Sequence, residues 1–191
     1  MSHLPQVPAY PVETSYVVVI ENIGLSNYLF EIYDENDHDD YRTLDDLTYM
    51  DPNTFKITKV IFDLIGERTP MAHERTTRAP LLKDSLPTML MFMADPVEII
   101  LNHKTQNLVC EAFVDIPSAT ILRMTRWEKS FGQLRILRKK LASGTLKRLY
   151  LSGTWPKTIQ NNLKEAIKAS RRRGGTRLRV YLPRGHPWRL R

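Results

Sequence analysis

The sequence has a single cysteine, Cys110, among its 191 residues, so no disulfide and no cluster of thiolate metal ligands can form within the chain. No run of residues approaches the roughly 18 apolar residues that a membrane-spanning helix needs. Neither a basic nor an apolar segment follows Met1, and we therefore expect no secretory signal. Together with a hydrophobic content of 42%, which suffices for a buried core, these absences favour an intracellular globular protein.

Acids are scarce in the last part of the chain, so charge of the two signs is separated along the sequence. Residues 1–120 contain 8 lysines and arginines and 19 acids, a net charge of −11, whereas residues 121–191 contain 20 and 2, a net charge of +18. The two parts can neutralise each other only in part, and clustered cations attract polyanions. We expect a polyanionic partner, and the charge leaves open whether this is RNA or nucleoprotein, an anionic membrane in peripheral contact, or both.

The pattern of prolines, charges and apolar residues predicts one domain with two extensions. We expect a mobile Pro-rich arm over residues 1–14, a single domain over residues 15–182, and a basic tail over residues 183–191. Within the domain, the acidic part is 15–120 and the basic part is 121–182. The predicted fold class is α+β, a mostly antiparallel sheet with packed helices and a C-terminal strand–helix–strand unit.

Apolar periodicity and turn residues predict the individual elements. The expected strands are 16–20, 28–33, 55–65, 88–93, 107–116, 145–151 and 177–182. The expected helices are 97–103, 118–129, 133–142 and 156–172, with Gly144 ending the third of them. We expect a turn over 21–24, an acidic loop over 34–46 and a long loop over 66–87, and no internal repeat is visible.

The helix expected over residues 156–172 separates apolar from basic residues. At 100° per residue, Ile159, Leu163 and Ile167 fall on one side, and the cations fall on the other. Such a basic face repels itself and exceeds what the helix dipole needs, so it points to an anionic partner rather than to a plain solvated face. Arginine forks bind phosphates in bidentate fashion without reading bases. Basic residues on this helix, on the next strand and on the helix over 133–142 complete the predicted polyanion-binding set, which is Lys157, Lys164, Lys168, Arg171, Arg172, Arg173, Arg177, Arg179, Arg138, Lys139 and Lys140.

Aromatic residues near these cations are candidates for stacking on bases. Tyr181 and Trp188 fit that role, whereas core packing is the expectation for Tyr150 and Trp155.

Signals of catalysis are weak. The five histidines have no metal-ligand spacing, and no phosphate-binding loop or nucleophile elbow is present. We expect no enzyme activity, no catalytic residue, no metal, no cofactor and no small-molecule substrate.

Two families share features with this sequence. The segment from Leu149 through the helix ending near Ala169 resembles the opening strand and helix of an RNA-recognition motif domain, without its aromatic strand. The overall plan resembles the matrix protein of a rhabdovirus-type negative-strand RNA virus. The shared features are the size, the arm with Pro8-Ala9-Tyr10-Pro11-Val12, the basic helix, and the strand–helix–strand end from Thr145 to Leu182.

The second resemblance implies a non-enzymatic structural protein that bridges nucleoprotein and anionic membrane and associates with itself. It also implies peripheral membrane or virion association, whereas the expected location on the residues alone is intracellular, in the cytoplasm or the nucleus. The alternative is an RNA-binding regulator such as a suppressor of RNA silencing. A metal-dependent hydrolase using the acidic loop is the third hypothesis and has the least support.

Overall fold

The computed structural model describes residues 14–24, 27–37, 39–62, 77–79, 82–101, 109–126, 131–172 and 177–184. Its strands are β1 (Thr14–Gly24), β2 (Asn27–Asp34), β3 (Tyr41–Arg42), β4 (Phe55–Phe62), β5 (Thr77–Ala79), β6 (Met93–Leu101), β7 (Ile121–Arg126), β8 (Arg148–Gly153) and β9 (Arg179–Tyr181). Its helices are α1 (Leu82–Phe92), α2 (Val109–Val114), α3 (Phe131–Ser143) and α4 (Lys157–Arg172), with a short 3-10 helix η1 (Asp46–Tyr49).

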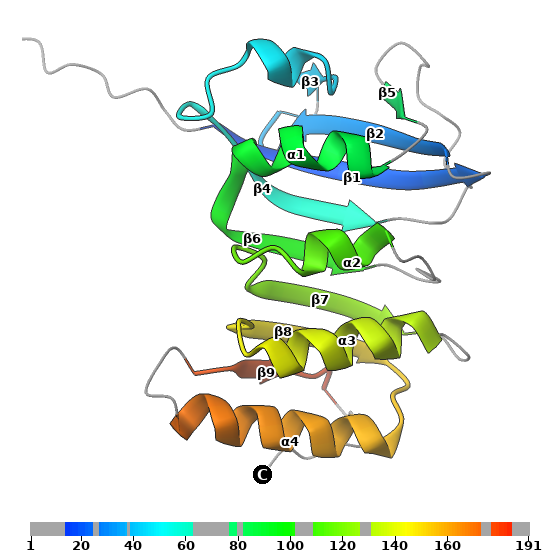
Figure 1. Cartoon of the computed structure of the whole chain (residues 1–191), viewed down its shortest axis with the longest axis vertical. Helices are drawn as coiled ribbons and strands as arrows, with labels where there is room; N and C mark the ends of the chain where they lie inside the picture. The colour runs from blue at the N-terminus through cyan, green and yellow to red at the C-terminus, as the bar shows by residue number, and fades with distance from the viewer. Residues whose placement is uncertain are drawn as a thin grey trace, which may run out of the picture.

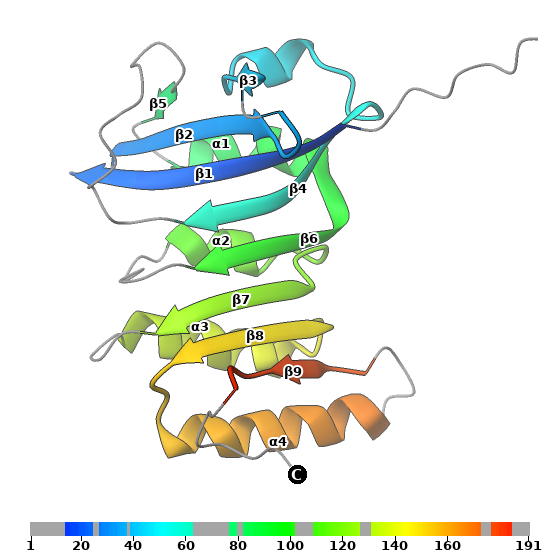
Figure 2. The same cartoon turned by 180° about the vertical axis from the view of Figure 1, so that it is seen from behind.

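The strands form one mixed sheet in the order β3-β2-β1-β4-β6-β7-β8-β9, with β5 pairing β2. Strand β2 runs antiparallel to its neighbours, but every pairing from β1 through β9 is parallel. Along this parallel part, the order in the sheet is the order in the chain. Helices α1, α2 and α3 lie on one face, none of the described helices covers the other face, and α4 lies at the β9 end (Figures 1 and 2).

This arrangement repeats one unit, a strand followed by a helix. Glu98, Ile121, Arg148 and Arg179 are register partners on neighbouring strands, and successive partners are separated by 23, 27 and 31 residues along the chain. The unequal spacing explains why no repeat is visible in the sequence. The units have in common only that buried and exposed side chains alternate along each strand, with the buried side packed against the helices.

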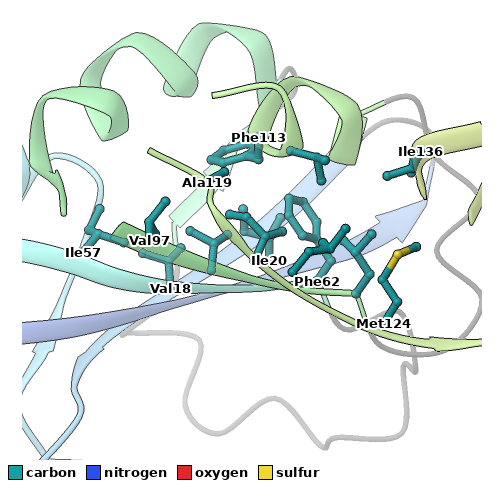
Figure 3. Packing of buried hydrophobic residues seen from close by; sticks show 14 of the residues in the cluster. Val18, Ile20, Ile57, Phe62, Val97, Phe113, Ala119, Met124 and Ile136 are labelled. Atoms are coloured by element: carbon teal, nitrogen blue, oxygen red, sulfur yellow. The ribbon is translucent and has the colours of Figure 1, made fainter. Parts of the chain in front are cut away.

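The core lies between the sheet and the helices (Figure 3). Val60, Ile99, Leu122 and Leu149 occupy neighbouring register positions on the helix side and are all fully or almost fully buried. Helix residues close over them, among them Phe113, whose ring meets the Phe62 ring edge-on at 5.4 Å between centroids. Burial of such side chains contributes about 1.5–3 kcal/mol each, which makes this layer the main source of stability.

The expectation of a mostly antiparallel sheet is wrong, although the mixture of helices and strands is confirmed. The error lies between residues 88 and 129, where four expected elements have the opposite secondary structure. The expected strands 88–93 and 107–116 coincide with helices α1 and α2, and the expected helices 97–103 and 118–129 coincide with strands β6 and β7. From β4 to β9, a helix therefore lies between each parallel strand and the next and returns the chain to the same end of the sheet.

The physical reason is that short apolar runs carry no decisive period. Residues 97–101 read as a helix because Asp95-Pro96 resembles a helix start, yet Val97, Ile99 and Leu101 are the alternate buried positions of a strand. Pro87 lies inside α1, where helix propensity argues against it.

Predictions elsewhere agree better with the structure. Strands β1, β2 and β4 and helices α3 and α4 lie where expected, and β8, α4 and β9 confirm the C-terminal strand–helix–strand unit. Gly144 follows the end of α3 with φ 69°, which a glycine adopts at low cost. The expected turn over 21–24 is wrong because β1 continues to Gly24, and the expected loops contain β3, β5 and the start of α1. Most of the arm and tail lies outside the described residues.

Candidate polyanion-binding surfaces

Helix α4 carries the distribution of residues that the sequence predicts. Ile159 and Leu163 are 0% exposed and pack into the core, whereas Lys157, Lys168, Arg171 and Arg172 are exposed and Lys164 is half-buried. The acid of this helix, Glu165, binds Lys168 at 2.8 Å, and this hydrogen bond and charge lower the pKa of its carboxyl group. We call the five cations the α4 basic face. The sixth predicted residue here, Arg173, lies outside the described residues.

Lys140 does not belong to a polyanion-binding surface, and its prediction is corrected. Its side chain is 2% exposed, and its Nζ donates hydrogen bonds to the carbonyl oxygens of Val114 at 2.6 Å and Ile116 at 3.4 Å. Burial lowers its pKa to about 8. The ammonium group holds the turn after α2 against α3 and is not accessible to a partner. Of its two neighbours, Arg138 is exposed and Lys139 forms an ion pair with Asp115.

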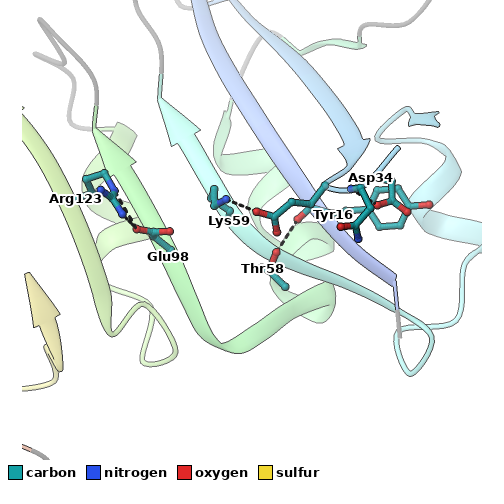
Figure 4. Close-up of polar contacts among 8 residues, drawn as sticks. Tyr16, Asp34, Thr58, Lys59, Glu98 and Arg123 are labelled. Atoms are coloured by element: carbon teal, nitrogen blue, oxygen red, sulfur yellow. Dashed lines mark hydrogen bonds and ion pairs between the residues drawn. The ribbon is translucent and has the colours of Figure 1, made fainter. Parts of the chain in front are cut away.

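The sheet face away from α1, α2 and α3 carries a second set of polar residues, and we call it the open face (Figure 2). Strand alternation places Lys59, Glu98, Ile121, Arg148 and Arg179 in one row across it, in register from β4 to β9. Figure 4 shows the ion pairs in its first half, Lys59 with Glu35 and Arg123 with Glu98, the latter at 3.1 Å. Lys59 and Arg123 each have an acidic partner.

The second half of that row ends in two arginines. Arg148 and Arg179 are direct register partners, both are exposed, and no acid of the described residues lies within 4 Å of either. Like charges directly opposite each other on neighbouring strands destabilise the pair. Leu178 and Val180 pack toward the core, so Arg179 points away from the helices. The last strand thus forms a basic surface on the open face, separate from the α4 basic face.

A stack of planar groups lies beside these arginines. The rings of Tyr150 and Tyr181 are 4.5 Å apart between centroids and 10° from parallel. On the other side of Tyr150, the guanidinium of Arg123 lies 4.4 Å from the ring centroid. These three residues border a pocket of about 360 Å³, whose other lining residues are Thr125, Leu151, Ser152, Leu182 and Pro183.

The expected core position of Tyr150 is wrong, because β8 points this residue to the open face. Trp155 is 4% exposed and packs in the core as predicted, with its indole N–H donating to the Ser152 carbonyl at 2.8 Å. Tyr181, a predicted stacking candidate, is 40% exposed. The sequence signal that was missed is the motif Arg-x-Tyr, present at Arg148 and again at Arg179 in neighbouring parallel strands.

The acidic segment, which is the described part of residues 34–46, lies at the opposite end of the sheet from α4 (Figure 1). Its acids make local contacts: Asp40 accepts a hydrogen bond from the Tyr16 hydroxyl at 2.6 Å and another from Arg42 at 3.0 Å. Burial and the bond to Asp40 raise the pKa of Tyr16 to about 12. Among the described residues, no three metal-ligating side chains gather in one place. None of the helices that the structure describes is long and apolar enough to cross a membrane.

Comparisons with protein-family models, with curated proteins and with solved structures found no match to this chain.

Proposed function

We propose that the protein is a non-enzymatic binding protein whose basic end binds RNA, free or in a nucleoprotein. The observation that carries this proposal is the α4 basic face, in which five cations are offset by one acid, Glu165. Each cation that meets a phosphate releases counterions, so binding is strong at low salt and does not depend on base sequence.

RNA is favoured over a membrane as the main partner because the apolar side of α4 is already in use. Ile159 and Leu163 are fully buried, so the helix has no apolar face to insert between lipids. Contact with an anionic membrane would be electrostatic only, worth about 1 kcal/mol per cation near the surface.

A structural role of the viral matrix type is the broader form of this proposal. It adds peripheral membrane contact and self-association to RNA binding, and it is supported by the size and by the separation of charge between the two ends. Light scattering over a range of protein concentrations, with and without RNA, separates it from an RNA-binding regulator, which does not assemble. Sedimentation with acidic liposomes tests the membrane contact.

The test of RNA binding compares two variants with the same loss of charge. The variant K164Q/K168Q/R172Q removes three cations of the α4 basic face. The control N36D/Y49E/M91E lowers the net charge by the same amount at exposed positions near the acidic end. Fluorescence anisotropy with labelled RNA at several salt concentrations measures the affinity and its salt dependence.

We expect the α4 variant to bind RNA more weakly and with a salt slope smaller by about 2 to 3, because each of three lost phosphate contacts contributes about 0.7 to 0.9 to the slope. The control should keep the slope of the original chain. Equal binding by the original chain and the α4 variant at low salt would refute the proposal.

A further inference from the structure

The open face of β8 and β9 combines two features that an unliganded sheet does not need. Arg148 and Arg179 are direct register partners of the same charge, without an acidic partner among the described residues. Two positions further along the same strands, Tyr150 and Tyr181 are register partners and stack on each other. Because the pair of arginines costs stability, an anionic group placed between them would offset a repulsion that the fold leaves in place.

The two pairs are spaced along the strands by two residues, about 7 Å. An anion and a planar ring at that spacing are features of a nucleotide unit, which joins a phosphate to a base. Tyr181 is 40% exposed, so its ring has surface available for a further planar group. Arg123 is engaged by Tyr150 and by Glu98, and it therefore supports the stack instead of binding phosphate.

We propose that this part of the open face binds single-stranded RNA, with a phosphate held between Arg148 and Arg179 and a base stacked against the Tyr150–Tyr181 pair. This inference rests on the proposed function and adds a second site, on a different surface from the α4 basic face. It selects single strands because the bases of a duplex are stacked on each other and present no free ring face. An acidic peptide would satisfy the arginines but would leave the tyrosine pair without a planar partner.

The experiment replaces the exposed tyrosine and one arginine. The variants are Y181L, which removes the ring, Y181F, which keeps it, and R179Q. The matched control is Y49L, because Tyr49 is 91% exposed and belongs to η1 at the acidic end. The probes are an oligouridine strand of twelve residues, the same strand carrying one 2-aminopurine, and a labelled RNA duplex of equal length. Thermal unfolding confirms that each variant is folded.

We expect Y181L to bind the single strand about five- to 150-fold more weakly, the range measured for loss of one stacked base. Y181F and Y49L should bind like the original chain, and R179Q should bind more weakly with a smaller salt slope. The original chain should quench 2-aminopurine fluorescence, and Y181L should not. None of these changes should affect duplex binding.

Different failures have different meanings. If Y181L and R179Q bind the single strand normally while the α4 variant loses it, the open-face site is wrong and the proposed function stands. If oligoglutamate displaces the single strand at equal charge, and does so equally from Y181L, the site recognises acidic chains and the inference is overturned. If the chain binds neither form of RNA, both proposals fall.

Discussion

Replacing the buried lysine of α3 tests whether its ammonium group is desolvated. Burial lowers the pKa of Lys140 to about 8, against 10.5 for an ordinary lysine and in spite of the nearby charge of Asp115, which acts in the opposite direction. Between these pH values the unfolded chain binds more protons than the folded chain, so the free energy of unfolding rises with pH. One pKa unit corresponds to about 1.4 kcal/mol, and the rise attributable to Lys140 between pH 8 and 10 is about 2 kcal/mol.

Urea unfolding at pH 7, 8, 9 and 10 measures this rise in the original chain and in K140M. Groups other than Lys140 contribute equally to both proteins, so the difference between the two curves isolates this residue. We expect the original chain to gain about 2 kcal/mol relative to K140M from pH 8 to 10. The matched control is K157M, because Lys157 is an exposed lysine at the start of α4 and should leave the slope unchanged. Parallel curves for the original chain and K140M would show that the ammonium is hydrated, which would refute the assignment of Lys140 to the interior.

Three further changes test the fold. L163A should lower the free energy of unfolding by about 2–5 kcal/mol in urea, because Leu163 is fully buried and leaves a cavity. G144A should cost about 1–2 kcal/mol in the same assay, since Gly144 has φ 69° and alanine disfavours that conformation. In a titration followed by phenolate absorbance, Tyr16 should ionise near pH 12, and D40N should lower its pKa because the hydrogen-bond acceptor loses its charge.

How well each element could be predicted depends on whether its sequence contains a complete period. Helix α4 spans sixteen residues with a polar and an apolar side, so its position and its exposed face follow from spacing alone. The segments that form α1, β6, α2 and β7 are shorter or mostly apolar, and their helix or strand character is decided by their place between neighbouring strands. The parallel order follows from these four assignments together, which is why the expectation of a mostly antiparallel sheet was wrong while the mixture of helices and strands and the C-terminal unit were right.

The candidate site shows the same division. The cations of α4 could be predicted because one helix determines which of them share a face. Lys140 could not, since its burial depends on the turn after α2, which supplies the carbonyl oxygens of Val114 and Ile116 from far along the chain. The pairing of Arg148 with Arg179 likewise depends on the parallel register of β8 and β9. Which residues of one element share a face follows from their spacing in the sequence. Which residues of different elements meet also depends on the order and direction of the strands.

The order of the strands also places the acidic and basic parts of the sequence at different ends of the sheet. Because parallel strands follow one another in chain order, a charge difference along the sequence becomes a charge difference along the sheet. The segment around β3, where Asp40 is hydrogen-bonded to Tyr16 and Arg42, lies near one end, while α4 lies at the other (Figure 1). At physiological ionic strength, charges are screened beyond about 8 Å, so the acidic segment does not mask the basic surfaces of its own chain. Contact between the two ends requires two copies, and the self-association proposed for a matrix-type role would then be head-to-tail and weakened by salt.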